Sequence, residues 1–255
     1  MRYILEAQGL NKTYWINKDN NLNALVNVNM QISESEFVAV MGPSGSGKST
    51  LLYNISGMDR PTSGKLTFQG KSIEKLSEKQ IAELRLKDMG FIFQNMHLLS
   101  NLNVYDNVIL PGYILKKEKR EVINYRAKQL MKHTGIAGLE NNDITQVSGG
   151  QLQRVAICRA LINNPSIIFG DEPTGALNSR FAEEVMDILE EINRQGTTIL
   201  LATHDIKVAA RTERVLYMSD GKLIGEFYLG KLDTDNRNLH QRGERLTDWL
   251  KEKGF

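Results

Sequence analysis

Along the first third of the chain, apolar residues either alternate with polar ones or gather into short runs. Residues 26–32 alternate strictly, which is typical of a strand with one buried face. The run Phe37–Met41 follows a short polar turn and predicts a buried strand, and residues 64–70 form another short strand bounded by glycines. Because the connections are too short for helical crossovers, we expect these early strands to be antiparallel.

The middle of the chain favours helices. Residues 75–86 have helical character and lead into residues 89–94, an apolar run that predicts a buried strand ending in a glutamine. Residues 113–134 are highly charged and favour a helix with apolar side chains along one face, namely Ile123, Ala127, Leu130 and Met131. We interpret this stretch as a helical subdomain.

In the last third, strand and helix patterns alternate. A helix is predicted to begin at Ser148, its N-cap, and to end before Pro165. Residues 167–171 and 197–203 predict buried strands, separated by a helix with apolar positions at Val185, Ile188, Leu189 and Ile192. Such alternation predicts a parallel sheet covered on both faces.

Two features follow these strands. Residues 215–227 predict a hairpin that turns at the Asp-Gly pair of residues 219–221. Near the end of the chain, Leu246, Trp249 and Leu250 could form a small apolar face. The sequence leaves open whether this face meets a partner or the body of the chain itself.

Composition narrows the function classes. With 255 residues the chain can form one large α/β unit with a subdomain. A net charge of +2 is too balanced for a dedicated nucleic-acid binder. The single cysteine, Cys158, excludes an internal disulfide framework, and its place in a predicted helix favours a buried structural thiol. No signal peptide or membrane span is predicted, so we expect a soluble chain or one peripheral to a membrane through a partner.

A glycine-rich loop follows the predicted strand at 37–41. Residues 42–49 fit the pattern G-x-x-x-x-G-K-[ST], with a strand before it and a helix after it. Its backbone N–H groups and the helix start would surround phosphates, Lys48 would reach the outer phosphates, and Ser49 would hold Mg²⁺. The nucleotide-binding residues predicted here are Gly42, Ser44, Gly45, Ser46, Gly47, Lys48, Ser49 and Thr50.

Polar residues follow three of the predicted strands. Ligands bind at the carboxyl ends of parallel strands, where Asp171 would hold Mg²⁺ and Glu172 would orient or deprotonate a water that attacks the γ-phosphate. Gln94 could reach metal or water with its amide. His204 could donate to the γ-phosphate or hold the water, although a lone histidine is more often structural.

Two further groups could contact a nucleotide. Tyr14 could stack on adenine, with Trp15 and ordinary core packing as competing interpretations. The segment Val147–Gln151 forms a second helix start suited to an anion, with Ser148, Gly149, Gly150 and Gln151 as its candidate residues. Because one phosphate group hardly uses two cradles of one subunit, these residues predict a head-to-tail dimer with ATP between the subunits. By itself, however, the segment could be only a capped helix.

These motifs, in this order, resemble the nucleotide-binding subunits of ATP-binding-cassette (ABC) transporters over most of the chain. The resemblance implies ATP and Mg²⁺ as ligands, with Tyr14 stacking on adenine and Glu172 as catalytic base. It implies His204 and Gln94 as further catalytic groups, with Gln94 sensing both the metal and a membrane partner. The implied metal ligands are Ser49, Gln94 and Asp171. Coupling helices of the partner would insert near residues 93–99.

The implied fold is α/β: a P-loop NTPase with a mixed RecA-like core sheet, an antiparallel β subdomain and a helical subdomain, the ABC ATPase fold. We expect one domain over residues 1–255. Within it, residues 1–95 would form the nucleotide-binding core with the β subdomain, residues 96–160 the helical subdomain with the signature, and residues 161–229 the second half of the core. Residues 230–255 would form a C-terminal extension.

Residues 84–94 and 169–175 are similar to one subgroup of this family. It contains macrolide exporters, lipoprotein-release ATPases and antimicrobial-peptide resistance transporters. The subgroup implies a motor for export or mechanotransmission, at the cytoplasmic face of the cell membrane. The implied partners are a second ATPase subunit, an integral membrane permease and, in some members, a periplasmic or extracellular adaptor; no nucleic acid is expected. A role in antibiotic resistance is also implied.

Two residues depart from the family pattern. Asn178 stands where an aspartate is usual, which leads to the hypothesis of altered communication between the sites and altered, slower turnover. Val147 replaces a leucine, and we expect little effect from this smaller apolar side chain.

Two other functions are considered. A soluble ABC-type ATPase of DNA repair or translation usually carries long coiled coils or two cassettes, and this chain shows neither a heptad run nor a second phosphate loop. A P-loop kinase for a small metabolite would explain residues 42–50 but would leave residues 147–151 and His204 without a role.

Overall fold

The computed structural model describes residues 2–17, 20–233 and 238–254. The chain forms two compact units: unit 1 consists of Met1–Ile81 and Thr198–Phe255, and unit 2 of Ala82–Thr197. Residues 234–237 and 255 of the predicted C-terminal extension lie outside the described residues, as do residues 1, 18 and 19 of the predicted nucleotide-binding core.

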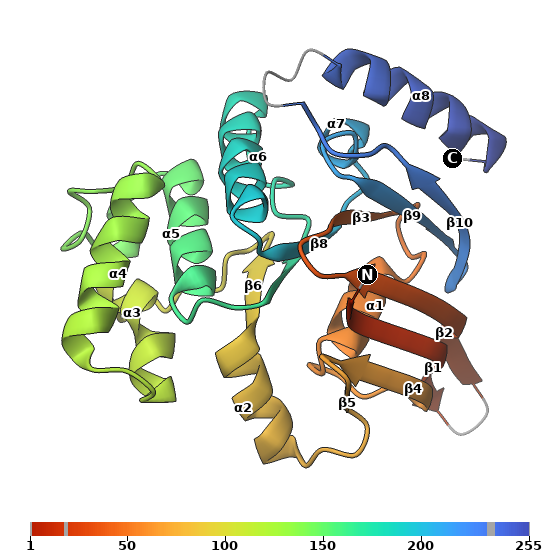
Figure 1. The fold of residues 1–255 in the computed structure, drawn as a ribbon, viewed down its shortest axis with the longest axis horizontal. Helices are drawn as coiled ribbons and strands as arrows, with labels where there is room; N and C mark the ends of the chain where they lie inside the picture. The colour runs from red at the N-terminus through yellow and green to blue at the C-terminus, as the bar shows by residue number, and fades with distance from the viewer. Residues whose placement is uncertain (1, 18–19, 234–237, 255) are drawn as a thin grey trace. The chain divides into compact units, whose positions relative to one another are not determined.

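An antiparallel sheet forms one part of unit 1 (Figure 1). Its strands β1 (Tyr3–Asn17), β2 (Asn20–Ser33), β4 (Ser63–Phe68) and β5 (Lys71–Ser72) lie in the order β2-β1-β4-β5. Val28, Met30 and Ile32 are buried, as their alternation predicts. The next buried residue is Leu25 rather than Val26, because Asn27 adopts a left-handed backbone (φ 50°) that breaks the alternation. β2 and β4 each pair antiparallel with β1, a strand that no pattern in the sequence predicted. The sheet is therefore antiparallel as expected, but β2 and β4 run in the same direction on either side of β1 and do not pair with each other.

Strand β3 (Phe37–Met41) does not belong to that sheet. It pairs in parallel with β8 (Thr198–Ala202) on one side and β9 (Arg214–Ser219) on the other. The expectation that it pairs antiparallel with its early neighbours is wrong, because the turn after β2 passes the chain into a second sheet. All five of its residues are buried, as in a parallel strand covered on both faces.

A hairpin completes this second sheet in unit 1. Strand β10 (Lys222–Tyr228) pairs antiparallel with β9, and the turn lies at Asp220 (φ 46°) and Gly221 (φ 75°). Both turn residues have positive φ, as a type I′ turn requires. The predicted hairpin is therefore confirmed.

The last helix packs against the body of its own unit. In α8 (Leu239–Glu252), Leu246 and Leu250 are buried in a cluster that includes Val215 and Tyr217 of β9. Trp249 stacks on Phe227 of β10, with the ring centroids 5.2 Å apart. The apolar face left open by the sequence is thus covered within the chain.

One buried arginine fastens α8 in place. Arg242 is only 3% exposed, and its guanidinium donates to five backbone carbonyl oxygens. The acceptors belong to two segments of unit 1, Ala210 and Thr212 in one, and Leu229, Gly230 and Lys231 in the other. A planar guanidinium can satisfy several carbonyls at once, which a lysine cannot match.

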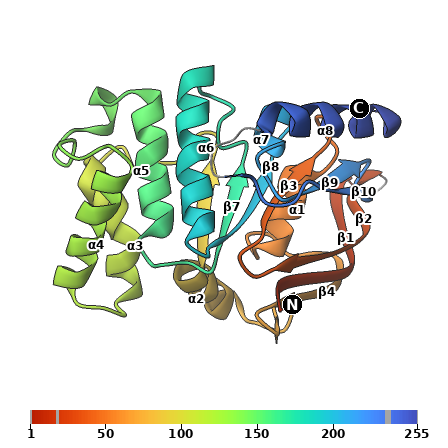
Figure 2. The same cartoon turned by 45° about the horizontal axis from the view of Figure 1, so that its top comes forward.

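Unit 2 contains two parallel strands and a group of helices that lie side by side in Figures 1 and 2. The strands are β6 (Met89–Phe93) and β7 (Ile167–Asp171), as predicted. The helices are α3 (Val104–Leu115), α4 (Arg120–His133), α5 (Gly149–Leu161) and α6 (Ser179–Arg194), with a 3₁₀ turn at Ile144–Gln146.

The charged stretch 113–134 is not one helix. Helix α3 ends at Leu115 and α4 begins at Arg120, because Lys116 takes a left-handed conformation (φ 55°) that terminates α3. Ile123, Ala127 and Met131 are buried as predicted, whereas Leu130 is only partly buried. The expected apolar face is therefore confirmed within a shorter helix.

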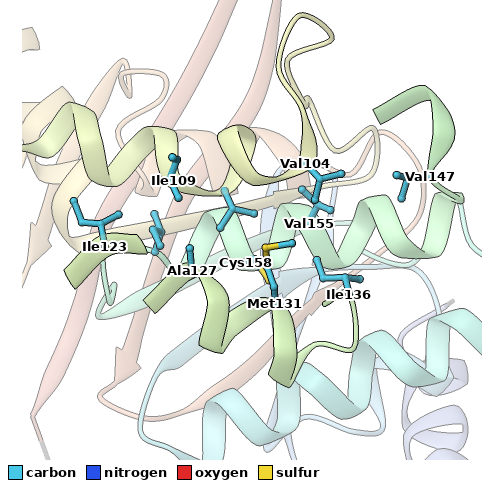
Figure 3. Packing of buried hydrophobic residues seen from close by; sticks show 11 residues of the cluster. Val104, Ile109, Ile123, Ala127, Met131, Ile136, Val147, Val155 and Cys158 are labelled. Atoms are coloured by element: carbon cyan, nitrogen blue, oxygen red, sulfur yellow. The ribbon is translucent and has the colours of Figure 1, made fainter. Parts of the chain in front are cut away.

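The apolar face of α4 packs into a core shared with α3 and α5 (Figure 3). Cys158 of α5 lies in this core and is fully buried. Burial raises the pKa of its thiol to about 12. The thiol is consequently protonated at neutral pH, and its predicted structural role fits this environment.

Two remaining helices of unit 1 are α1 (Lys48–Ile55) and α7 (Ile206–Ala209). Helix α2 (Glu78–Asp88) crosses the point in the chain at which the units divide. Within the described ranges, none of the helices combines the length and the apolar character that a bilayer span needs.

Candidate functional site

The glycine-rich loop connects β3 to α1. Strand β3 ends at Met41, and α1 begins at Lys48 with Gly47 as its N-cap. Gly47 has φ 101°, and a Cβ there would lie 2.6 Å from the carbonyl oxygen of Ala24. No side chain could be accepted at this position without a shift of the backbone. The strand–loop–helix context that the motif requires is therefore present.

The loop is held by the distant β9–β10 hairpin. The amide of Gly221 donates to the carbonyl oxygen of Ser46 at 3.0 Å. The carbonyl oxygen of Gly221 in turn accepts from the amide of Val26 at 2.9 Å. A Cβ on Gly42 would lie 2.1 Å from the carbonyl oxygen of Met218. The shape of the loop thus depends on residues that lie far from it in the sequence.

The interior of the loop suits an anion. The ammonium of Lys48 donates to the carbonyl oxygens of Gly42 and Pro43, at 2.8 and 3.0 Å, and the residue is 9% exposed. The buried hydroxyl oxygen of Ser46 has no hydrogen-bond partner among the described residues. Because a buried hydroxyl without a partner costs free energy, the loop fits a ligand with hydrogen-bond acceptors. The phosphates of ATP meet that requirement.

Tyr14 lies on β1 beside this loop, in the same unit. Its hydroxyl donates to Asp59 at 2.7 Å, and the Thr50 hydroxyl at the start of α1 also contacts the phenol. Burial and the bond to Asp59 raise the pKa of Tyr14 to about 12. Tyr14 is 38% exposed and Trp15 is 69% exposed, so neither is a core residue. Core packing is therefore excluded for both.

His204 lies two residues after the end of β8 and is exposed. Strand β8 runs parallel to β3, with Ala202 opposite Val40, so His204 and Gly42 follow the carboxyl ends of adjacent strands. The next residue, Asp205, caps α7 by accepting from the amide of Lys207 at 2.7 Å. Unit 1 therefore presents His204 and the glycine-rich loop at one edge of its sheet, as predicted.

Unit 2 brings Gln94 and Glu172 together in the same way. They follow the parallel strands β6 and β7, whose last residues Phe93 and Asp171 are paired. A Cβ on Gly175 would lie 3.0 Å from Nε2 of Gln94 and 3.4 Å from Cβ of Glu172. Glu172 has φ 47°, a strained value for this residue type that is more frequent at functional sites.

The segment before α5 is an exposed helix start. Ser148 is the N-cap: its hydroxyl accepts from the amide of Gln151, and its own amide donates to Oε1 of Gln151 at 3.0 Å. Ser148 and Gly149 are exposed, and a Cβ on Gly149 would meet nothing within 4 Å. Gly150 instead lies against the ring of Phe181. The predicted cap is confirmed, and Gln151 closes a capping box with it.

Comparison with known proteins decides the family. The model of the ABC transporter family matches residues 25–175, more than half of the chain. The chain belongs to the ABC transporter family. Membership implies ATP binding and hydrolysis, which agrees with the loop at residues 42–49.

The chain is similar to two relatives, and it covers a different share of the length of each. It is 42% identical over all 255 residues to the ABC transporter ATP-binding protein YxdL of Bacillus subtilis, and covers 96% of that protein. It is 42% identical over 223 residues, or 88% of its length, to the macrolide export ATP-binding/permease protein MacB of Mannheimia succiniciproducens. It spans only 34% of the length of that second relative.

Solved ABC cassettes confirm the predicted fold. The cassette MJ0796, solved as a dimer in a post-hydrolysis state with ADP and Pi, has a TM-score of 0.82 and 39% identity, over 88% of this chain and 98% of that one. CbiO1 of Clostridium perfringens, part of an ABC transporter complex, has a TM-score of 0.80 and 32% identity, over 98% of this chain and 100% of that one.

The unusual Asn178 of this ABC chain caps a helix. Its side chain accepts from the amide of Phe181 at 3.1 Å, as the N-cap of α6. An aspartate could make the same bond, so the structure gives Asn178 a local role that either residue can fill.

Some contacts around the candidate site are not predictable from sequence motifs. Arg159 of α5 donates to the carbonyl oxygens of Met96 and His97, at 2.5 and 2.6 Å, in the loop that follows Gln94. Met96 and His97 both have positive φ. The arginine therefore holds an irregular loop to the helix of the signature segment. A single arginine on a helix gives no local signal of such a contact.

Proposed function

We propose that this chain is the ATP-binding and ATP-hydrolysing motor subunit of an ABC transporter, of the translocase class of enzymes. It drives export or mechanotransmission through a separate membrane permease. The observation that carries the proposal is the presence in one chain of two glycine-containing helix starts suited to an anion, the loop before α1 and the exposed cap of α5. A phosphate group between two subunits can use both.

The site residues have distinct roles in this proposal. Lys48 and the backbone of residues 42–50 bind the phosphates, and Tyr14 stacks on the adenine. Ser148, Gly149 and Gly150 of the partner's equivalent segment close the site from the other side, with Gln151 fixing the cap. Glu172 acts as the base for the attacking water, and Gln94 and His204 orient the water and the γ-phosphate.

Ser49, Gln94 and Asp171 are the proposed ligands of Mg²⁺. Their donors are hydroxyl, amide and carboxylate oxygens, the kind of ligand that Mg²⁺ prefers. When bound, the ion neutralises charge on the phosphates.

The comparisons support the assembly in part. MJ0796 is a dimeric cassette, and a head-to-tail dimer is the arrangement proposed for this chain. MacB combines an ATP-binding part with a permease, and this chain spans only the matching third of it. We propose, as the subgroup resemblance implies, that the permease is a separate partner and that the ATPase lies at the cytoplasmic face of the membrane. Macrolides, lipoproteins and antimicrobial peptides remain the proposed cargo classes, with an extracytoplasmic adaptor as a further partner.

The variant Glu172→Gln tests the site. It keeps the shape of the side chain but removes the base, so ATP should bind and persist. We expect ATPase activity to fall by about a hundredfold or more, the loss typical of a missing general base. Size-exclusion chromatography with Mg-ATP should show a dimer. Glu121→Gln, an exposed glutamate in the first turn of α4, is the control.

A Glu172→Gln protein that stays monomeric with Mg-ATP would contradict the proposed dimer. Purification from detergent-solubilised membranes tests the transporter role separately. A motor subunit should be recovered with an integral membrane protein, whereas a soluble ABC-type ATPase should not. Phosphate release without an added acceptor distinguishes both from a small-molecule kinase.

A further inference from the structure

Three side chains of unit 1 contact Tyr14 and form a network with it. The four residues come from three segments: Lys12 and Tyr14 from β1, Thr50 from α1, and Asp59 from the loop after α1. Lys12 and Asp59 belong to no motif of the sequence and have no role in the site described so far. Their contacts indicate what they do.

The two carboxylate oxygens of Asp59 accept from different side chains, one from Tyr14 and the other from Lys12. Oδ2 accepts from the hydroxyl of Tyr14 at 2.7 Å, and Oδ1 accepts from the ammonium of Lys12 at 2.7 Å. Oδ1 also accepts from the amide of Arg60 at 2.8 Å, and Lys12 donates to the carbonyl oxygen of Arg60 at 2.7 Å. Both partners of the ion pair are thus fixed to the backbone of the same loop.

The network also fixes which face of the ring is available. The ammonium of Lys12 lies 4.7 Å from the centroid of the Tyr14 ring, in a cation–π arrangement. One face of the ring is therefore covered by protein, and a base can stack only on the opposite face. The neighbouring Trp15 is 69% exposed, and alternation along the strand places it on the other face from Tyr14.

The protonation states agree with this geometry. Burial alone would raise the pKa of Asp59, but the hydrogen bonds from Lys12 and Tyr14 and the charge of Lys12 outweigh it and lower that pKa. Burial and the Asp59 carboxylate raise the pKa of Tyr14. At neutral pH the acceptor is charged and the phenol keeps its proton, so the bond that orients the ring is a charge-assisted one.

The geometry points to Asp59 and Lys12 as positioning residues for nucleotide binding: together they hold the Tyr14 ring in a fixed orientation beside α1, with one face presented to the base. This inference rests on the proposed stacking of Tyr14 on adenine. Through Thr50, which contacts the phenol, the base-binding ring is tied to the helix that follows the phosphate loop. Base and phosphates are then held by one connected group of residues.

The test compares ATP with inorganic triphosphate, which has no base to stack. Affinities are measured for the full chain by competition against a fluorescent nucleotide. Tyr14→Ala should lower the affinity for ATP about tenfold and leave the affinity for triphosphate unchanged, because stacking on an aromatic ring contributes to base binding alone. Asp59→Asn and Lys12→Met should each lower the affinity for ATP about threefold, because each variant loses one orienting contact. The affinity for triphosphate should again be unchanged. Asp248→Asn, an exposed residue of α8, is the control.

Kinetics give a second readout. For Asp59→Asn the KM for ATP should rise while kcat stays near that of the wild type, because the ring acts in binding rather than in the chemical step. Tyr14→Phe keeps the ring but removes the hydroxyl. The double variant Tyr14→Phe/Asp59→Asn should therefore lose less ATP affinity than the sum of the losses in the two single variants.

The outcomes separate the inference from the proposed function. If Tyr14→Ala selectively weakens ATP but Asp59→Asn and Lys12→Met do not, the positioning role is wrong and the stacking role stands. If Asp59→Asn weakens ATP and triphosphate equally, the residue supports the phosphate loop instead and the inference fails. If Tyr14→Ala changes neither ligand, the proposed stacking itself is wrong.

Discussion

The helix starts of α1 and α5 differ in what holds them. The loop before α1 is shaped by contacts from far along the chain, since Ser46 is bonded to Gly221 and Gly47 lies against Ala24. The start of α5 is shaped by its own neighbours, because Ser148 and Gln151 cap each other three residues apart. One helix start is thus shaped by the tertiary structure, and the other by a local motif exposed to solvent.

The largest expected effect is on ATP affinity, when the charge of Lys48 is removed from the loop before α1. Lys48→Ala removes the only side-chain cation that the described residues place inside the loop before α1. Loss of one partner from a buried charge contact costs about 3 kcal/mol, so ATP affinity should fall more than a hundredfold. A fluorescent-nucleotide titration measures it, with the exposed Lys79→Ala as control. Unchanged affinity would contradict the phosphate-binding role of the loop.

A distant substitution should also damage the loop before α1. In Gly221→Ala the new Cβ would lie 2.8 Å from the carbonyl oxygen of Ala24, at a residue with φ 75°. Such strain costs about 2 kcal/mol, so unfolding in urea should begin at lower concentration and ATP should bind more weakly. Gly243→Ala in α8, where a Cβ meets nothing within 4 Å, is the matched control and should not weaken binding. Unaltered stability in Gly221→Ala would show that the hairpin does not support the loop.

At the start of α5 a substitution should act locally. Ser148→Ala removes the N-cap and should lower the free energy of unfolding by about 1 kcal/mol. Ser148→Asp restores the cap but places a negative charge where a phosphate is proposed to bind. Its stability should recover while ATP-dependent dimerisation, followed by light scattering in the Glu172→Gln background, is lost. Dimerisation of Ser148→Asp would mean that this helix start does not contact the nucleotide.

The smallest effect is expected at the start of α6. Asn178→Asp keeps the bond to the Phe181 amide and adds a negative charge at a helix N-terminus, which should raise stability by about 0.5 kcal/mol. Denaturant unfolding measures this change. The ATPase rate and its cooperativity test the separate hypothesis that Asn178 alters communication between the sites. If neither changes, that hypothesis is to be dropped.

The features that the sequence predicts correctly are those encoded by neighbours in the chain. The Ser148 cap, the Asp220-Gly221 turn and the glycine-rich loop each need only a few adjacent residues. The sheet to which β3 belongs could not be predicted, because its partners β8 and β9 lie more than 150 residues away. The same holds for Asp59 and Arg159, whose contacts join segments that no local pattern connects.

The bonds that Lys48 makes to its own loop bear on how a nucleotide arrives. The ammonium directs N–H groups to two carbonyl oxygens of the loop, so its charge is already positioned before a phosphate would bind. Because Gly42 follows β3 and Lys48 begins α1, the same bonds join the two ends of the loop.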